Sequence, residues 1–388
     1  MPGYGAAPGP RLLATVSAVT TAAERREFVE LPYRLYSGDP YWVPPLRRDI
    51  HELLDPTRHP FHQHATVQLF LARDHGGRVV GRVAAIRNDR YLDEHDDSVG
   101  FFGFFECVNE PEVARALLDA AGHWLSERGL TTMRGPMSFS LNEEAGLLVD
   151  GFDGSPMVMM PYNPPWYAAL IEGSGLAKTR DLLAYSIVYE GAARTPPERI
   201  VRLADALARR NNVVIRSLDM SRFWEEMERI EKVYNGAWSK NWGHVSMTAA
   251  ELRHMAKQFK PVVDPELVLF AEVNGELAGF ALGLPDMNQV LKHLDGRLLP
   301  FGWAKALWHS RRVNAFRVLT VGVLEPYRRM GVAELMYLRY WSVCPPRGIT
   351  SGEQSWILEN NTLMRAALEK LGARLYRTYR LYDRPLDA

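Results

Sequence analysis

The stretch that decides the fold is RVLTVGVLEPYRRMGVAELMYLRYW, residues 317–341. Its first eight residues are mostly apolar or β-branched and predict a strand over 317–324, whereas the residues from Val332 onward predict a helix. A short basic loop that contains Gly331 joins the two. Such a loop directs free backbone N–H groups and the positive end of the helix macrodipole at one point, so it predicts a phosphate-binding site.

Individual residues of this loop favour the same ligand. Gly331 lets the backbone approach a phosphate closely, and the small Ala333 keeps the start of the helix open. The side chains of Arg328 and Arg329 add charge-assisted hydrogen bonds. The alternative is that both arginines are solvated charges on an ordinary turn. The predicted phosphate-binding residues are Arg328, Arg329, Gly331, Val332 and Ala333.

A faint internal repeat divides the chain in two. The 388 residues exceed what one hydrophobic core usually serves. Four residue pairs recur 197 or 198 positions apart, namely Gly81 and Gly279, Asn163 and Asn361, Gly175 and Gly372, and Tyr185 and Tyr382. The small-residue and proline stretch 191–197 is the natural boundary. We therefore expect a first domain over 1–191 and a second over 192–388.

Each half has the same order of predicted elements. A strand and one or two helices precede a hairpin, predicted over 69–86 and 269–282, each with a glycine-containing turn. A strand, a helix, a further strand, a helix and a last strand follow. This order predicts an α/β fold, with two tandem domains that each have a mixed, mostly antiparallel sheet flanked by helices.

The loop pattern Arg328-x-x-Gly331-x-Ala333 after a strand resembles the pyrophosphate loop of the GNAT superfamily of acyltransferases. Asn361, eleven residues before Gly372, resembles the Asn near the start of that family's fourth helix. The resemblance implies an acyl-coenzyme A co-substrate, with its diphosphate on the loop and Asn361 beside it. It also implies that the backbone of Val321 and Val323 binds the pantetheine arm.

The whole chain, including 41–49 and 352–360, is similar to a two-domain bacterial GNAT-like group that includes ceramide synthases. That similarity implies N-acyl transfer to a primary amine, with a long fatty acyl group and a sphingoid base; acetyl transfer stays open. Two alternatives remain, an aminoacyl transferase of the two-domain GNAT-like type and a non-catalytic coenzyme A-binding module. The 46 basic and 46 acidic residues cancel, which does not support a tRNA or other nucleic-acid partner.

The sequence departs from the family pattern at two places. The family often has a Tyr seven residues after the helix Asn, as an acid towards the leaving thiolate, and this chain has Leu368. Tyr327, Tyr376, a water or no acid at all are the alternatives. In the first half, residues 109–112 take the place of the loop, without glycine and with carboxylates that would repel phosphate. We therefore expect one coenzyme A site per chain, in the second domain.

Candidate acceptor-binding residues lie in two loops. The apolar insertion 135–164 of the first half and the segment 234–243 of the second mix apolar residues with isolated polar ones. In one interpretation they bind the substrate, and in the other they cap turns or pack in the core. The candidates are Asn142, Tyr162, Asn235, Trp238 and Asn241.

An amine must lose a proton before it attacks, so a carboxylate in a partly desolvated cleft is the candidate base. Asp286, Glu353 and Glu143 are the candidates in that order, with surface carboxylates as the alternative. The 11 histidines show no metal-ligand spacing, so no metal is expected.

Two cysteines and the lack of a signal or spanning segment favour a soluble, cytoplasmic protein. The segment 291–316 is rich in Leu, Trp and Phe and carries Lys305, Arg311 and Arg312. It covers an acyl chain, contacts the inner face of a membrane, or packs as a buried amphipathic helix.

Overall fold

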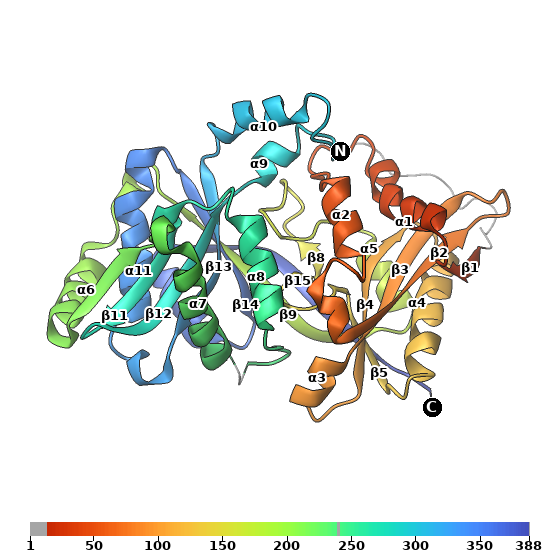
Figure 1. Cartoon of the computed structure of the whole chain (residues 1–388), viewed down its shortest axis with the longest axis horizontal. Helices are drawn as coiled ribbons and strands as arrows, with labels where there is room; N and C mark the ends of the chain where they lie inside the picture. Colours follow the sequence, from red (N-terminus) through yellow and green to blue (C-terminus); the bar gives the residue numbers. More distant parts are fainter. Residues whose placement is uncertain (1–13, 239–240, 388) are drawn as a thin grey trace.

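The computed structural model describes residues 14–238 and 241–387. Figure 1 shows two α/β halves joined by strands at the centre of the molecule. The elements of the first half are β1 (Thr15–Ala18), α1 (Ala22–Leu35), α2 (Arg47–Leu53), β2 (Ala65–Arg73), β3 (Val79–Asn88), α3 (Asp89–Glu94), β4 (Val99–Cys107), α4 (Pro111–Ser126), β5 (Thr132–Gly135), β6 (Met137–Ser138), β7 (Glu144–Ala145), β8 (Leu147–Asp150), α5 (Tyr167–Gly173) and β9 (Ala177–Val188).

The second half repeats this order. Its elements are α6 (Glu198–Asn211), β10 (Val213–Ser217), α7 (Phe223–Trp238), α8 (Ala249–Phe259), β11 (Val268–Val273), β12 (Glu276–Pro285), α9 (Asn288–Leu291), α10 (Gly302–Ser310), β13 (Ala315–Val323), α11 (Val332–Val343), β14 (Ser351–Leu358), α12 (Thr362–Lys370) and β15 (Arg374–Pro385). The predicted α/β class with a mixed sheet flanked by helices is confirmed.

The two halves share one sheet. Among the described residues it has 13 strands, in the order β1-β2-β3-β4-β5-β15-β9-β14-β13-β12-β11-β10, with β8 also paired to β15. Most neighbours are antiparallel, whereas β4–β5 and β13–β14 are parallel. The predicted boundary at 191/192 falls between β9 and α6, but the sheet runs continuously across it.

The last strand of each half lies in the sheet of the other. β15 pairs with β5, where Tyr382 lies opposite Gly135, and β9 pairs with β14, where Val188 lies opposite Ser351. β9 and β15 also pair with each other along most of their length. Neither half therefore completes its sheet without the other.

The cores follow the same exchange. Leu381 of β15 is fully buried in the cluster that contains Phe28 and Val29 of α1, which belongs to the first half. Tyr185 of β9 is buried in the cluster of the second half, beside Met336 and Tyr340 of α11. Hydrophobic burial thus joins the halves as firmly as the strand hydrogen bonds do.

Replacing Leu381 with Ala should destabilise the whole chain. The side chain is fully buried, so a cavity remains, and the free energy of unfolding should fall by about 2–5 kcal/mol. Denaturant unfolding followed by fluorescence and by circular dichroism should keep one shared transition.

The matched control is Leu375→Ala in the same strand, where the side chain is 45% exposed. It should change the stability by no more than about 0.5 kcal/mol. Independent unfolding of the two halves in the Leu381 variant would contradict the shared core.

Candidate functional site

Strands β13 and β14 run in parallel and then separate. Their pairing covers Ala315–Val318 against Ser351–Gln354, whereas β13 continues to Val323 beside β12 alone. The Leu324 N–H donates to the Ala278 carbonyl oxygen on the β12 side. Because backbone groups alternate along a strand, those of Val321 and Val323 face the opening between β13 and β14. An opening of this shape leaves hydrogen-bonding groups for an extended ligand.

The loop after β13 enters α11 through a glycine in the left-handed conformation. Gly331 has a φ of 79° and is the N-cap of α11, with no side-chain cap among the described residues. A side chain at this position would be strained, and a Cβ would lie 2.9 Å from the Leu207 Cδ1 atom. Arg328 and Arg329 are exposed beside the helix start, and Arg328 Nε donates to the Val323 carbonyl oxygen over 3.2 Å.

The same opening in the first half is filled by the chain itself. β4 and β5 pair only over Val99–Phe101, and β6 then occupies the space beside β4. A Cβ on Gly103 would lie 2.1 Å from the Met137 carbonyl oxygen. The Phe104 N–H also donates to Ser138 Oγ over 3.3 Å. An extended ligand therefore has no room there.

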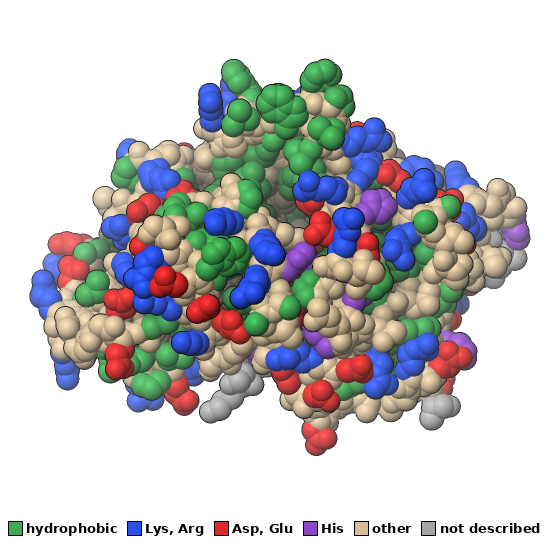
Figure 2. All heavy atoms as spheres, viewed as in Figure 1, with side chains coloured by type: hydrophobic (Ala, Val, Ile, Leu, Met, Phe, Trp, Pro, Cys, Tyr) green, Lys and Arg blue, Asp and Glu red, His purple; other side chains and the backbone are tan. Residues whose placement is uncertain are grey.

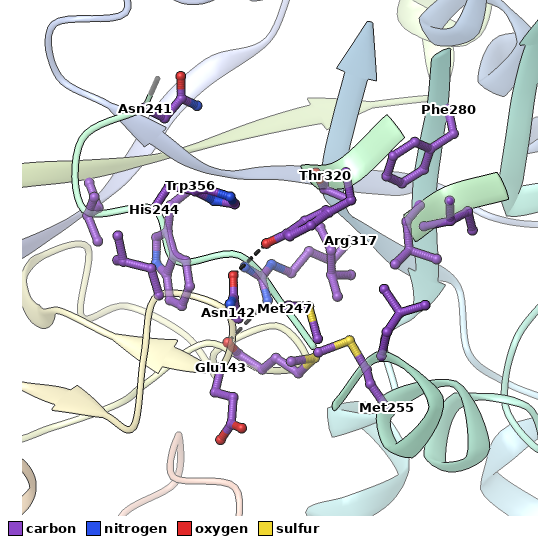
Figure 3. A pocket seen from close by; sticks show the side chains of 18 of the residues that line it. Asn142, Glu143, Asn241, His244, Met247, Met255, Phe280, Arg317, Thr320 and Trp356 are labelled. Carbon is purple, nitrogen blue, oxygen red and sulfur yellow. Dashed lines mark hydrogen bonds between the residues drawn. The ribbon is translucent and has the colours of Figure 1, made fainter. Parts of the chain in front are cut away.

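A cavity of about 200 Å³ lies at the opening of the second half. Its walls come from β12, β13, β14, α7, the segment 241–255 and the first-half loop at residues 141–143 (Figure 3). Asn142 holds this junction, because its Nδ2 donates to the Val245 carbonyl oxygen over 3.0 Å and its Oδ1 accepts from the Tyr234 hydroxyl. The lining includes Asn142, Glu143, Tyr234, Asn241, Arg317, Thr320 and Trp356.

A second cavity of about 410 Å³ lies between the halves. It is bounded by α2, α8, α9 and the first-half loop over 156–163. Apolar side chains alternate there with carboxylates, including those of Asp49, Glu106 and Glu144. The two cavities share Asn142, Glu143, Met159, Met247 and Met255 in their walls.

Glu143 is the carboxylate at this junction. Its burial, followed by the nearby charges of Glu251 and Glu144, raises the pKa of its carboxyl to about 8. Figure 3 shows its carboxylate pointing away from Thr320 and Trp356. The Glu143 Oε1 atom lies 3.5 Å from Nε2 of His59, and burial lowers the pKa of His59 to about 4, so that imidazole is neutral at pH 7.

The other two predicted bases line neither cavity. Asp286 Oδ1 accepts hydrogen bonds from the N–H groups of Val158 and Asn288, over 3.0 and 3.3 Å. Burial raises the pKa of Asp286 to about 7. Glu353 is buried, accepts from the hydroxyls of Ser355 and Tyr376, and lies 3.5 Å from Arg317 Nε. Of the three candidate bases, Glu143 is the one that belongs to the described cavity walls.

Arg317 is a residue that the sequence reasoning missed. Its guanidinium is 2% exposed and donates to the carbonyl oxygens of Val158 and Met159, over 2.9 and 3.1 Å. It thereby holds the first-half loop against the sheet of the second half. Only its position on the predicted strand could have indicated this, because its partners lie about 160 residues away in the sequence.

The predicted acceptor-binding residues are distributed unevenly. Asn142 and Asn241 line the smaller cavity, and Tyr162 lines the larger one and donates to Asp39. Asn235, on α7, donates to the Met247 carbonyl oxygen and is absent from the described walls of both cavities. The side chain of Trp238, at the end of α7, lies outside the described part of the chain.

The remaining predicted site residues lie around the edge of the opening. Tyr327 donates to Glu276 over 3.3 Å, outside the described cavity walls. Asn361 caps α12, where its Oδ1 accepts from the Met364 N–H over 3.2 Å. Leu368 is buried in the core of the second half, so no acid projects from that position.

Relatives of known name match the chain over nearly its full length. It is 39% identical over 382 residues to the bacterial ceramide synthase of Caulobacter vibrioides, covering 96% of this chain and 97% of that protein. It is 36% identical over 367 residues to protein YghO of Escherichia coli, covering 93% of each. The chain belongs to this GNAT-like acyltransferase family. No family model matches it.

Solved structures agree on the fold. A tandem GNAT protein from the clavulanic acid biosynthesis pathway has a TM-score of 0.55 at 12% identity, over 97% of this chain and 99% of that one. A GCN5-related N-acetyltransferase from Sphaerobacter thermophilus has a TM-score of 0.51 at 15% identity, over 97% and 96%. The protein is an N-acyltransferase, and its fold implies an acyl-coenzyme A co-substrate.

Residues 14–238 and 241–387 contain neither a helix long and apolar enough to span a bilayer nor a cluster of three or more His, Cys, Asp or Glu side chains suited to a metal ion.

Replacing Glu143 with Gln should stabilise the protein at high pH. Between pH 4.5 and about 8 the folded chain holds a proton on Glu143 that the unfolded chain has lost, so this group lowers stability as the pH rises. The variant should melt at a higher temperature than the wild type at pH 9. The two should differ little at pH 4, where the carboxyl is protonated in both states.

Thermal melts of both proteins from pH 4 to 9 measure this difference. Glu112→Gln, at a half-buried carboxylate on α4, is the control and should not change the pH dependence. A melting temperature for the Glu143 variant that tracks the wild type at every pH would contradict a buried, proton-binding Glu143.

Proposed function

We propose that the protein transfers a long fatty acyl group from acyl-coenzyme A to the primary amine of a sphingoid base. The observation that carries the proposal is the meeting of two cavities at Glu143, one at the strand opening and a larger, partly apolar one between the halves. The name of the Caulobacter relative supports the choice of acceptor, since that protein is a ceramide synthase.

The donor binds along β13 in this proposal. The diphosphate lies on the loop at Arg328–Ala333, where α11 starts without a side-chain cap among the described residues. The pantetheine arm follows the backbone edge of Val321 and Val323 into the smaller cavity. One coenzyme A binds per chain, because β6 fills the equivalent opening of the first half.

The acceptor occupies the larger cavity. Its apolar walls, which include Ile50, Leu53 and Phe259, remove hydrocarbon from water, worth about 0.8 kcal/mol for each buried CH₂ group. The carboxylates of Glu143 and Glu144 attract an ammonium group at the end of such a chain. Both features fit an amine that carries a long alkyl tail.

The chemistry needs one proton transfer at Glu143. In its ionised form, which predominates above the pKa of about 8, the Glu143 carboxylate takes a proton from the acceptor ammonium, and the neutral amine attacks the thioester carbonyl carbon. The C–N bond forms, the C–S bond breaks, and the second amine proton passes to water as the amide is formed. Glu143 can then donate the proton that it took from the ammonium to the coenzyme A thiolate. Leu368 in place of a Tyr therefore does not block the reaction.

Replacing Arg328 and Arg329 together with Ala should weaken coenzyme A binding. Each charge-assisted hydrogen bond is worth about 1.5–3 kcal/mol, so the loss of one from each arginine should lower the affinity for acetyl-coenzyme A about 10²- to 10⁴-fold. Thermal-shift titration measures this, with the exposed pair Arg311→Ala/Arg312→Ala as control.

The same titration with octanoyl- and palmitoyl-coenzyme A separates the acyl groups. Stabilisation that increases with chain length supports the lipid substrate, and equal stabilisation by all three indicates acetyl transfer. If no thioester stabilises the wild type, the donor assignment is wrong.

Glu143→Gln should lower kcat about 10²- to 10⁴-fold and leave the affinity for acyl-coenzyme A unchanged, since the base acts only on the amine. Glu144→Gln is the paired control, because Glu144 lines only the larger cavity. It should raise the KM for the amine and change kcat little. A fully active Glu143 variant would rule out this residue as the base.

The rate with a sphingoid base and palmitoyl-coenzyme A gives the substrate test. Transfer from an aminoacyl-tRNA, or none from any donor, would favour the other two interpretations of the sequence.

A further inference from the structure

The turn before α10 and the helix itself expose a concentrated apolar surface. Leu299 and Phe301 are 78% and 73% exposed, and Trp303, Leu307 and Trp308 are each 57–58% exposed. These five residues, here called the α10 surface, form the apolar projection at the top of Figure 2, where Figure 1 places α10. The alternative that segment 291–316 packs as a buried helix is wrong.

The clustering distinguishes this surface from ordinary exposure. Thirteen large hydrophobic side chains of the described residues are exposed, and five of them fall within ten positions here. The other eight are spread over both halves. Scattered apolar residues are normal on soluble proteins, whereas a contiguous exposed patch of this kind marks a binding surface.

The segment that carries the α10 surface has more basic than acidic residues, with the exposed Asp295 at its start. The sequence contains no Asp or Glu between Gly296 and Leu324, while Arg297, Lys305, Arg311 and Arg312 lie in that stretch. The Arg312 guanidinium lies over the Trp308 ring, 4.9 Å from its centroid. Tryptophan beside basic side chains is the combination that favours the headgroup region of an anionic bilayer.

The α10 surface is attached firmly to the rest of the molecule. His309 of α10 stacks on His293, just after α9, with 3.8 Å between ring centroids. The backbone N–H of Arg47 in α2 donates to the Gly296 carbonyl oxygen over 3.1 Å. The Arg47 guanidinium donates to the backbone carbonyl oxygen of Asp295 over 2.6 Å. Both halves therefore hold this segment in place.

The surface also adjoins the larger cavity. Asn288 and Leu291 of α9 line that cavity, and α9 packs against α10. Figure 2 shows the molecule hollowed directly below the apolar projection. The helix α9 lies between the α10 surface and the larger cavity, and its four residues are uncharged. A lipid tail that moves from the α10 surface to the cavity along α9 would therefore meet no charged side chain of that helix.

We propose that the α10 surface docks on an anionic lipid bilayer and turns the mouth of the larger cavity toward the membrane. The occupant is the bilayer itself, since the excess of basic residues, Arg297, Lys305, Arg311 and Arg312, complements anionic headgroups and five apolar side chains can enter the interface. This inference goes beyond the proposed function, because docking does not depend on which amine or acyl group reacts.

The test is flotation of the full chain with vesicles of phosphatidylcholine alone or mixed with phosphatidylglycerol. The wild type should bind the anionic vesicles at least tenfold more tightly than the neutral ones. Trp303→Ser/Trp308→Ser and, separately, Arg311→Glu/Arg312→Glu should each weaken binding at least tenfold. Leu203→Ser/Leu363→Ser is the matched control, at exposed apolar positions on α6 and α12, and should bind as the wild type does.

Two outcomes would overturn the proposal. One is unchanged vesicle binding by the α10 variants. The other is a wild type that forms a dimer in light scattering without vesicles and a Trp303/Trp308 variant that is monomeric, which would make this surface a contact between two copies. Melting temperatures should match the wild type, since the substituted side chains are exposed.

Activity on detergent-solubilised substrates without vesicles distinguishes this proposal from the previous one. The docking variants should keep wild-type rates there. Vesicle binding without any transfer activity would support docking and contradict the proposed reaction. Transfer activity without vesicle binding would support the reaction and contradict docking.

Discussion

The pairing of β9 with β15 is the constraint on which the rest of the structure depends. Each strand ends one half of the chain and lies in the sheet of the other, so their antiparallel register sets how the halves are placed. Both cavities lie where the halves meet. Because a slip of one residue would turn every side chain of these strands to the opposite face, the register is strongly specified by the cores on both sides.

Buried charge then positions the loop that separates the cavities. Arg317 donates to the carbonyl oxygens of Val158 and Met159, and Asp286 accepts from the Val158 N–H. A basic and an acidic side chain thus bind the acceptor and donor groups of one backbone segment. Both side chains are buried, and the Arg317 guanidinium is compensated by Glu353, whose Oε1 lies 3.5 Å from Arg317 Nε, so removing Glu353 would leave a buried charge without its partner. Glu143 lies in the walls of both cavities, and its burial together with the nearby charges of Glu251 and Glu144 raises the pKa of its carboxyl to about 8.

Local pattern was enough to predict the elements and the loop. The strand over 317–324, Gly331 and the helix from Val332 are specified by neighbours in sequence. The rank of the carboxylates could not be predicted, because burial and partners come from segments far apart in the chain. Asp286 accepts a hydrogen bond from Val158, and Glu353 accepts one from Tyr376. Such contacts with residues distant in the sequence distinguish these two carboxylates from Glu143. The exchange of β9 and β15 between the halves could not be predicted for the same reason. An exchanged and an unexchanged strand have the same alternation of apolar and polar residues.

The exchanged strand also bears on how the chain folds during synthesis. β5 ends at Gly135, but its neighbour β15 begins only at Arg374. Ribosomes add about 5–20 residues per second, so roughly 10–50 s separate the two strands. During that interval the nascent first half has an open sheet edge beside β5, which is a site for pairing with other chains. Chaperone protection of this edge, and fast release of the carboxyl terminus, would therefore matter more for yield than the stability of the finished protein.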